Sequence, residues 1–355
     1  RRVGGYGIIM TFRWYGEGDP IPLRHIRQIP VVKGIVSALY DVPVGEIWPL
    51  ERMATLQRRI LDEGLALSVI ESIPVHEDIK LGRPTRDRYI DAYRQSIRNM
   101  GALGIPILCY NFMPVFDWMR TDLSMELPDG STALSYDHEA IEAIDIKDGI
   151  PDLPGWATAY SAEELRSLLD AYAGVGTEDL WRNLNYFLRA VVPVAEESGV
   201  RMGIHPDDPP WPVFGLPRII TDDAALARLT EIVDSPSNGI SFCTGSLGPN
   251  AGIDLIKSLG RFVRKGRVPF VHARNIRRTG ERAFHETAHC SESGDVDIYR
   301  IIRELADAGF DGAIRPDHGR MIWDERGRPG YGLYDRALGA MYLAGLWEAV
   351  GRSSK

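Results

Sequence analysis

Residues 201–210 read Arg-Met-Gly-Ile-His-Pro-Asp-Asp-Pro-Pro, a short apolar run that ends in polar residues and prolines. Similar runs return downstream as Gly-Ile-Ser-Phe-Cys at 239–243, Pro-Phe-Val-His-Ala at 269–273 and Gly-Ala-Ile-Arg at 312–315. Each has the length and composition of a buried strand, and helix-length amphipathic stretches separate most of them. Such alternation of strands and helices predicts a parallel sheet.

Four more strand candidates lie upstream, so the chain offers eight. They are expected at residues 8–13, 34–39, 66–71 and 106–110. Helices are expected at 46–63, 86–100, 162–172, 177–197, 221–233 and 296–308. Eight strand–helix units predict an α/β fold of the closed (β/α)₈ TIM-barrel type. A Rossmann-like open sheet is the alternative, but no Gly-x-Gly-x-x-Gly follows the first strand.

The connection after the fourth strand is much longer than one helical return, because about 90 residues separate Tyr110 from Arg201. We therefore expect a long insertion at about 113–176. It is either a surface excursion or, as we favour, a lid over the mouth of the barrel. A single domain is expected over 10–350, since no flexible linker supports the two domains that 355 residues would allow. Residues 1–9 are expected to be a flexible or non-native start.

Composition excludes several classes of protein. A hydrophobic content of 44% is too high for global disorder, and a net charge of −8 argues against a nucleic-acid partner. No apolar run reaches the roughly 18 residues that a membrane span needs. The three cysteines lie far apart, which predicts no disulfide framework and fits a reducing cytoplasm.

Four consecutive strands end in side chains that bind divalent metals, at the end of the barrel that faces the reaction. These residues are His205, Cys243, His272 and Asp317. Each alone is better explained as a packed or hydrogen-bonded residue, but together at one level they predict a metal site. Sulfur, imidazole and carboxylate ligands suit Zn²⁺, Fe²⁺ or Mn²⁺. The position at the mouth favours a six-coordinate ion with room for substrate.

Other polar residues are expected at the same mouth. Arg274 and Arg315 are candidates to clamp a substrate carboxylate, with a rim salt bridge as the alternative. His318 adjoins Asp317 and is a natural general acid or base. Tyr331 starts the last predicted helix and either reaches the mouth or packs against that helix.

Three residues that follow earlier strands suit a polyhydroxylated substrate, namely Trp14, His76 and Asn111; for Trp14, loop packing is an equal alternative. His285 and His289 stand in a His-Glu-x-x-His string, the spacing of zinc proteases. We favour a substrate-covering loop there, because only a short, weakly helical segment is expected and a third ligand is missing.

Several strings resemble the metal-dependent D-mannonate dehydratases of hexuronate (glucuronate) catabolism. They are Arg-Trp-Tyr-Gly at 13–16, Glu-Ser-Ile-Pro-Val-His-Glu-Asp-Ile-Lys at 71–80, Tyr-Asn-Phe-Met-Pro-Val at 110–115, His-Pro-Asp-Asp-Pro-Pro at 205–210, Phe-Cys-Thr-Gly-Ser at 242–246, Phe-His-Glu at 284–286 and Arg-Pro-Asp-His-Gly at 315–319. The resemblance runs from about residue 10 to about residue 348. It implies a xylose-isomerase-like barrel and a hydro-lyase that converts D-mannonate to 2-dehydro-3-deoxy-D-gluconate and water.

The resemblance also implies Mn²⁺ as the usual metal, with Fe²⁺ as an alternative, and a homo-oligomer. It assigns the ligands to the four strand-end residues and the acid–base groups to His318 and Tyr331, beside Asp317. A sugar or sugar-acid isomerase or epimerase on the same barrel is the second hypothesis, because metal-assisted enolisation serves both reactions. A metal-stabilised binding protein is disfavoured because it leaves His318 without a role.

Overall fold

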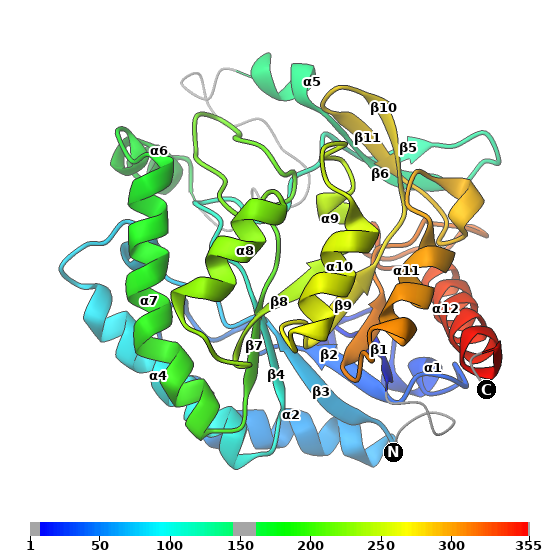
Figure 1. The fold of residues 1–355 in the computed structure, drawn as a ribbon, viewed down its shortest axis with the longest axis horizontal. Helices are drawn as coiled ribbons and strands as arrows, with labels where there is room; N and C mark the ends of the chain where they lie inside the picture. Colours follow the sequence, from blue (N-terminus) through cyan, green and yellow to red (C-terminus); the bar gives the residue numbers. More distant parts are fainter. Residues whose placement is uncertain (1–7, 145–160, 354–355) are drawn as a thin grey trace.

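The computed structural model describes residues 8–144 and 161–353. Eight parallel strands close into a barrel in the order β1-β12-β9-β8-β7-β4-β3-β2 (Figure 1). Their bounds are β1 Ile9–Arg13, β2 Gly34–Ser37, β3 Ala66–Glu71, β4 Ile107–Tyr110, β7 Arg201–Ile204, β8 Asn238–Cys243, β9 Phe270–Ala273 and β12 Ala313–Pro316. Every predicted strand matches one of these to within about two residues. The barrel prediction is confirmed, and the open-sheet alternative is wrong.

Helices surround the barrel (Figure 1). The described helices are α1 Leu23–Ile26, α2 Leu50–Asp62, α3 Glu77–Lys80, α4 Arg86–Ala102, α5 His138–Glu142, α6 Ala162–Tyr172, α7 Thr177–Glu197, α8 Asp223–Ile232, α9 Thr244–Leu247, α10 Leu255–Arg264, α11 Ile298–Asp307 and α12 Tyr334–Ser353. Helix α11 shows why they form. The side chain of Asp297 caps its N-terminus, and its buried residues Ile298, Ile301, Ile302 and Leu305 recur at helical spacing. The apolar face of the helix therefore packs on the barrel, while its polar face is exposed to water.

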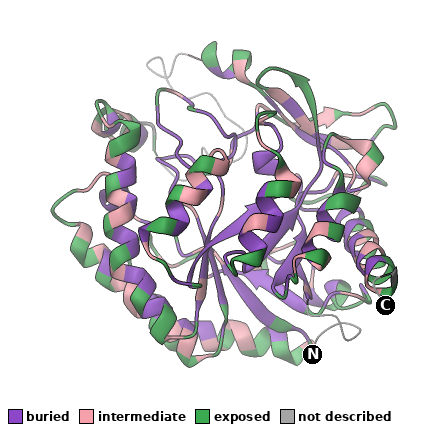
Figure 2. Cartoon of the chain, viewed as in Figure 1, coloured by how far each residue is buried: buried purple, intermediate pink, exposed green. Residues whose placement is uncertain are grey.

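The barrel strands are buried on both faces, as parallel strands covered by helices must be. Figure 2 shows buried residues along the strands and exposed ones on the outer sides of the helices. A small apolar layer fills the inside of the barrel, made of Val36, Val69, Ile107, Cys109, Phe270 and Ala313. A larger cluster packs between the barrel and the helices. The inside of the barrel is thus a packed core rather than a pore.

A second, antiparallel sheet lies at one end of the barrel (Figure 1). Its order is β10-β11-β6-β5, with β5 Asp122–Glu126, β6 Thr132–Asp137, β10 Ile276–Gly280 and β11 Ala283–Glu286. We call it the small sheet. Its strands were not predicted, and the weakly helical segment expected around His285 is wrong, because His285 pairs with Arg277 and Ser135 in the sheet. The zinc-protease string requires a helix, so that interpretation fails as well.

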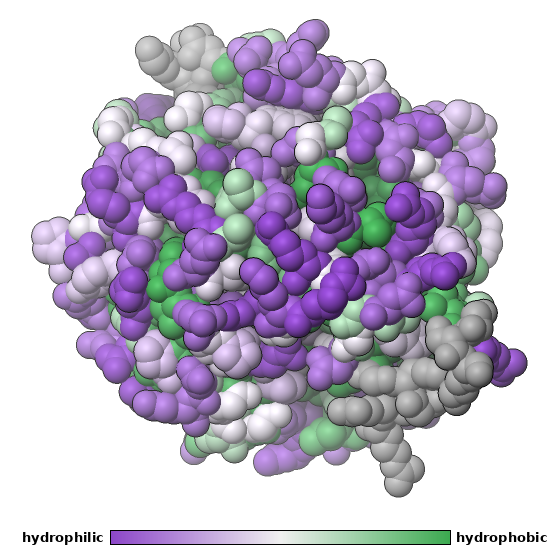
Figure 3. All heavy atoms as spheres, in the orientation of Figure 1, coloured by the Kyte–Doolittle hydropathy of each residue, from purple (hydrophilic) through white to green (hydrophobic). Residues whose placement is uncertain are grey.

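Between β4 and β7 the chain forms β5, β6, α5, α6 and α7, and both helices predicted there occur with the expected bounds. Residues 145–160 of the predicted insertion lie outside the described residues, and its action as a lid stays a prediction. In the part of the chain that the structure describes, no helix is long and apolar enough to cross a membrane. Figure 3 shows hydrophilic residues over most of the visible face. The three cysteines, Cys109, Cys243 and Cys290, form no disulfide bond.

Candidate active site

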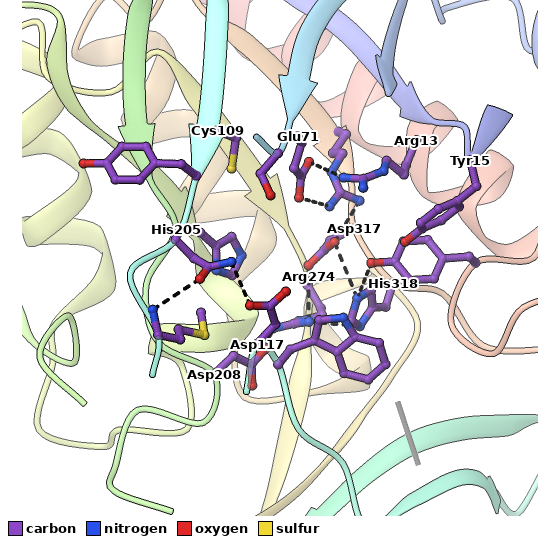
Figure 4. A pocket seen from close by; sticks show the side chains of 17 residues that line it. Arg13, Tyr15, Glu71, Cys109, Asp117, His205, Asp208, Arg274, Asp317 and His318 are labelled. Atoms are coloured by element: carbon purple, nitrogen blue, oxygen red, sulfur yellow. Dashed lines mark hydrogen bonds and ion pairs between the residues drawn. The ribbon is translucent and has the colours of Figure 1, made fainter. Parts of the chain in front are cut away.

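A cavity of about 120 Å³ lies at the carboxyl ends of the barrel strands (Figure 4). Its lining includes Arg13 from β1, Glu71 from β3, Asn111 after β4, His205 after β7 and Asp317 after β12. Because these residues end or follow parallel strands, the barrel brings them to one place from distant parts of the sequence. Enzymes with this fold use that end for their chemistry. The cavity is therefore the candidate active site.

Three of the four predicted metal ligands form a compact group. The ligand atoms of His205, Cys243 and His272 all lie within 4.8 Å of one another. Asp317 adjoins them, since its Oδ2 lies 3.6 Å from Cys243 Sγ and 3.9 Å from His272 Nδ1. Buried polar atoms normally have partners, yet neither ring nitrogen of His272 has a hydrogen-bond partner. Nε2 of His272 does lie 3.4 Å from Oε2 of Glu71, but a donor set whose buried ring nitrogens make no hydrogen bond fits a transition-metal ion.

A second group of ligand atoms overlaps the first. Glu71, Cys109 and His272 also lie within 4.8 Å of one another. However, Glu71 pairs with the guanidinium groups of Arg13 and Arg315, at 3.1 Å in both cases. Burial also raises the pKa of the Cys109 thiol well above its usual value. Two adjacent cations and a thiol that keeps its proton oppose a divalent cation, so the first group is the better metal site.

The two predicted acid–base groups form a buried pair in the cavity wall. Nε2 of His318 lies 2.9 Å from the Tyr331 hydroxyl oxygen, and Nδ1 lies 2.8 Å from the Glu286 carboxylate. The indole of Trp118 packs edge-on against the imidazole, with ring centroids 5.2 Å apart. Burial raises the pKa of Tyr331, so its hydroxyl keeps its proton at neutral pH. Tyr331 precedes α12 instead of starting it, and this loop position lets it reach the cavity.

The two arginines predicted to clamp a substrate carboxylate line the cavity and already have partners in the protein. Arg274 pairs with Asp208 at 2.6 Å. Arg315 pairs with Glu71 at 3.1 Å and with Asp317 at 2.8 Å. Burial alone would raise the pKa of Asp317, but the charge of Arg315 helps to hold it well below its usual range. The rim salt bridges considered as alternatives therefore exist here as buried ones, and a substrate contact stays a prediction.

Of the four remaining predicted substrate residues, one lines the cavity and three do not. Asn111 lines the cavity and donates from Nδ2 to Oδ1 of Asp117 at 3.1 Å. Trp14 is buried in the large apolar cluster. His76 caps helix α3, and His285 lies on β11, where its Nδ1 contacts the Glu286 carbonyl oxygen at 3.0 Å. The cavity lining does not include these last three residues.

Several charged or aromatic groups of the site were not among the sequence candidates. They include Arg13, Tyr15, Glu71, Asp208 and Glu286. Arg13, Tyr15, Glu71 and Asp208 end or follow barrel strands. The position at strand ends that singled out the metal ligands could therefore have found them. No comparable signal existed for Glu286, which reaches His318 from a strand of the small sheet.

The model of the D-mannonate dehydratase (UxuA) family matches residues 8–355 of this chain. A mannonate dehydratase of Streptococcus uberis is 57% identical over 98% of this chain and 99% of its own length. Mannonate dehydratase 2 of Halalkalibacterium halodurans is 55% identical over 96% of this chain and 99% of its own length.

The solved structures agree with this similarity. The crystal structure of mannonate dehydratase from Streptococcus suis serotype 2 superposes with a TM-score of 0.92 at 48% identity, covering 98% of this chain and 96% of that one. An L-ribulose 3-epimerase superposes with a TM-score of 0.53 at 14% identity, covering 97% and 96% of the two chains. At that identity the likeness shows a shared barrel fold and nothing about the reaction.

Proposed function

This chain belongs to the D-mannonate dehydratase family, and we propose that it removes water from D-mannonate to give 2-dehydro-3-deoxy-D-gluconate. The observation that carries the proposal is that two groups lie together at one end of the barrel, with His205, His318 and Tyr331 lining the cavity itself. The metal-ligand group of His205, Cys243 and His272 and the pair formed by His318 and Tyr331 meet at the carboxyl end of the barrel. This is the combination that elimination from a hydroxy acid needs.

The dehydration breaks two bonds of the substrate. The C2–H bond gives its proton to a base, and the C3–O bond breaks as an acid supplies a proton to the departing hydroxyl, so one water leaves. The resulting enol tautomerises to the 2-keto acid. The imidazole of His318 can accept a proton, and the hydroxyl of Tyr331, which is hydrogen-bonded to it, holds one. We therefore assign both proton transfers to this pair.

Four residues of this chain are proposed to hold the metal, namely His205, Cys243, His272 and Asp317. We propose Mn²⁺, with Fe²⁺ as the alternative, because the resemblance to the family implies Mn²⁺ and the sulfur, imidazole and carboxylate ligands suit either ion. A bound ion of this kind polarises substrate oxygens as a Lewis acid. Around it, we propose that Asn111, Arg274 and Arg315 orient the hydroxyl and carboxylate groups of the substrate, because all three line the cavity.

The test is incubation of the metal-loaded protein with D-mannonate and with several other aldonates, followed by mass spectrometry. Dehydration gives a 2-keto-3-deoxy acid that is lighter by one water. An isomerase or epimerase gives a product of unchanged mass, and a binding protein gives no product. Either of the last two results would refute the proposed reaction.

We also propose that the enzyme is a cytoplasmic homo-oligomer that binds neither nucleic acid nor membranes. A thiolate ligand requires a reducing compartment, and the three cysteines are free. Exposed apolar side chains gather beside α12, where Trp323 contacts Tyr334 and lies in a common hollow with Leu338. Such patches are typical of protein interfaces. Light scattering of the purified protein measures the oligomeric state.

A further inference from the structure

One carboxylate of the small sheet, that of Glu286, contacts a residue of the active site. Glu286 is the last residue of β11 and is 1% exposed. Its two oxygens lie 2.8 and 3.0 Å from Nδ1 of His318. The proposed reaction gives this carboxylate no part, although it makes the closest contact to the Nδ1 side of His318.

Arg274 competes for the same ring nitrogen. Its Nη1 lies 3.0 Å from Nδ1 of His318, and two N–H groups cannot bond to each other. The protons of Arg274 have other acceptors, because Nη1 lies 3.3 Å from Asp317 and 3.4 Å from Glu286, and Nη2 lies 2.6 Å from Asp208. The Nδ1 proton of His318 is therefore directed to the carboxylate of Glu286.

Glu286 is well suited to accept that proton in a hydrogen bond. Arg120 donates to its Oε1 from Nε at 3.1 Å and from Nη2 at 2.6 Å. Burial would raise the pKa of Glu286, but the guanidinium groups of Arg120 and Arg274 help to hold it below its usual value. An ionised carboxylate only accepts hydrogen bonds. The backbone pairing of Ile276 with Glu286 fixes where that carboxylate stands.

We propose that Glu286 is a positioning residue for His318, which holds the Nδ1–H tautomer and so directs Nε2 to Tyr331 and the substrate. This inference rests on the proposed dehydration, in which His318 exchanges a proton with the substrate. When the hydrogen bond at one ring nitrogen is fixed, the state and orientation of the other are fixed too. The small sheet thus takes part in ordering the catalytic pair.

The first test is steady-state kinetics of Glu286→Gln. The amide keeps the shape but can donate as well as accept, so it no longer selects one tautomer. We expect kcat to fall at least about tenfold with KM little changed, because losing a well-oriented acid–base group lowers turnover by about 10²–10⁴-fold. Glu281→Gln makes the same change at the exposed tip of the same hairpin and should leave both constants unchanged. An unchanged kcat in Glu286→Gln would overturn the proposal.

A double substitution separates positioning from a general structural effect. If Glu286 acts through His318, adding Glu286→Gln to His318→Asn should not lower the residual rate further. Independent, additive losses would show that Glu286 acts elsewhere and would overturn the proposal. If Glu286→Gln does not fold, Glu286→Asp takes its place, because it keeps the charge beside Arg120 while drawing it away from the imidazole.

The second test does not depend on turnover. In ¹⁵N-histidine-labelled protein loaded with diamagnetic Zn²⁺, nitrogen NMR reads the tautomer of His318, whose signals are identified by their loss in His318→Asn. We expect protonated Nδ1 in the wild type and a mixture of tautomers in Glu286→Gln. A protonated Nε2 with bare Nδ1 in the wild type would overturn the proposal. Wild-type protein that does not dehydrate D-mannonate would refute the proposed function, and the NMR result would still decide the role of Glu286.

Discussion

Replacement of Arg120 by Met tests how strongly buried charges join the small sheet to the barrel. Arg120 is 0% exposed and lies just before β5. Its guanidinium donates to both oxygens of Asp208, at 2.8 and 3.1 Å, and to Oε1 of Glu286, at 2.6 Å from Nη2. Met fills a similar space without charge. In the variant, the buried carboxylates of Asp208 and Glu286 therefore each have one neighbouring cation fewer than in the wild type.

Breaking a buried ion pair by removing one partner costs about 3–5 kcal/mol, because the remaining charge is left uncompensated. Unfolding entropy is about 2.1 cal/mol/K per residue near 60 °C, which for a chain of this length amounts to about 0.7 kcal/mol/K. The expected loss of stability therefore lowers the melting temperature by about 4–7 °C. Arg274 still neutralises both carboxylates in part, so the lower half of this range is the more realistic expectation.

The assay is thermal unfolding of the metal-loaded protein by circular dichroism, with Arg52→Met as the matched control. Arg52 contacts both oxygens of Asp41 at 2.7 and 2.6 Å, but this pair is exposed. Exposed pairs contribute about 0–1 kcal/mol, so the control should melt within about 1.5 °C of the wild type. Equal melting temperatures for Arg120→Met and the control would refute the reasoning.

The same experiment has a predicted pH dependence. The pKa of Glu286 is lowered from 4.5 to about 2, so its ion pairs contribute stability that is fully present above about 4.5. This contribution is lost as the pH falls toward about 2. Arg120→Met raises that lowered pKa, so the melting temperatures of variant and wild type should converge below about pH 4.5. A difference that grows on acidification would contradict this assignment.

Three further predictions concern the cavity. His318→Asn should lower kcat by at least about 10²-fold while metal content, measured by elemental analysis, stays unchanged; loss of metal would remove its acid–base assignment. Cys243→Ala should lose metal, and retention of metal by this variant at neutral pH would exclude Cys243 as a ligand. In the wild type, metal affinity should fall on acidification, because the thiolate and imidazole ligands must be deprotonated. Gly245→Ala should reduce turnover at least about tenfold, since the new Cβ would collide with the side chain of Arg274 and displace its pairs; wild-type kinetics with unchanged stability would show that Arg274 can move freely.

Two of the predicted substrate residues, Trp14 and His285, adjoin residues of the site in the sequence but do not line the cavity themselves. Trp14 is buried in the core while its neighbours Arg13 and Tyr15 line the cavity. Likewise, Glu286 contacts His318 while its neighbour His285 is not in the lining. Successive side chains of a strand point to opposite faces, so the neighbour of a residue that faces the site lies on the other face; contact of Trp14 and His285 with substrate stays a prediction. Sequence alone located the strand ends but did not establish which face points inward.

The sequence by itself determined the barrel and which residues of metal-binding type its strand ends bring together. The eight strands are short apolar runs whose pattern is local, and the carboxyl ends of neighbouring parallel strands must meet, so His205, Cys243 and His272 could be grouped without coordinates. Only the tertiary structure decided what surrounds them. The small sheet pairs residues 132–137 with 283–286, segments separated in the sequence by the barrel strands β7, β8 and β9. Short strands carry no local signal for such a distant partner. The contacts of Glu286 and Arg120 follow from that pairing, because a buried carboxylate finds its cation only when the folded chain brings the two together.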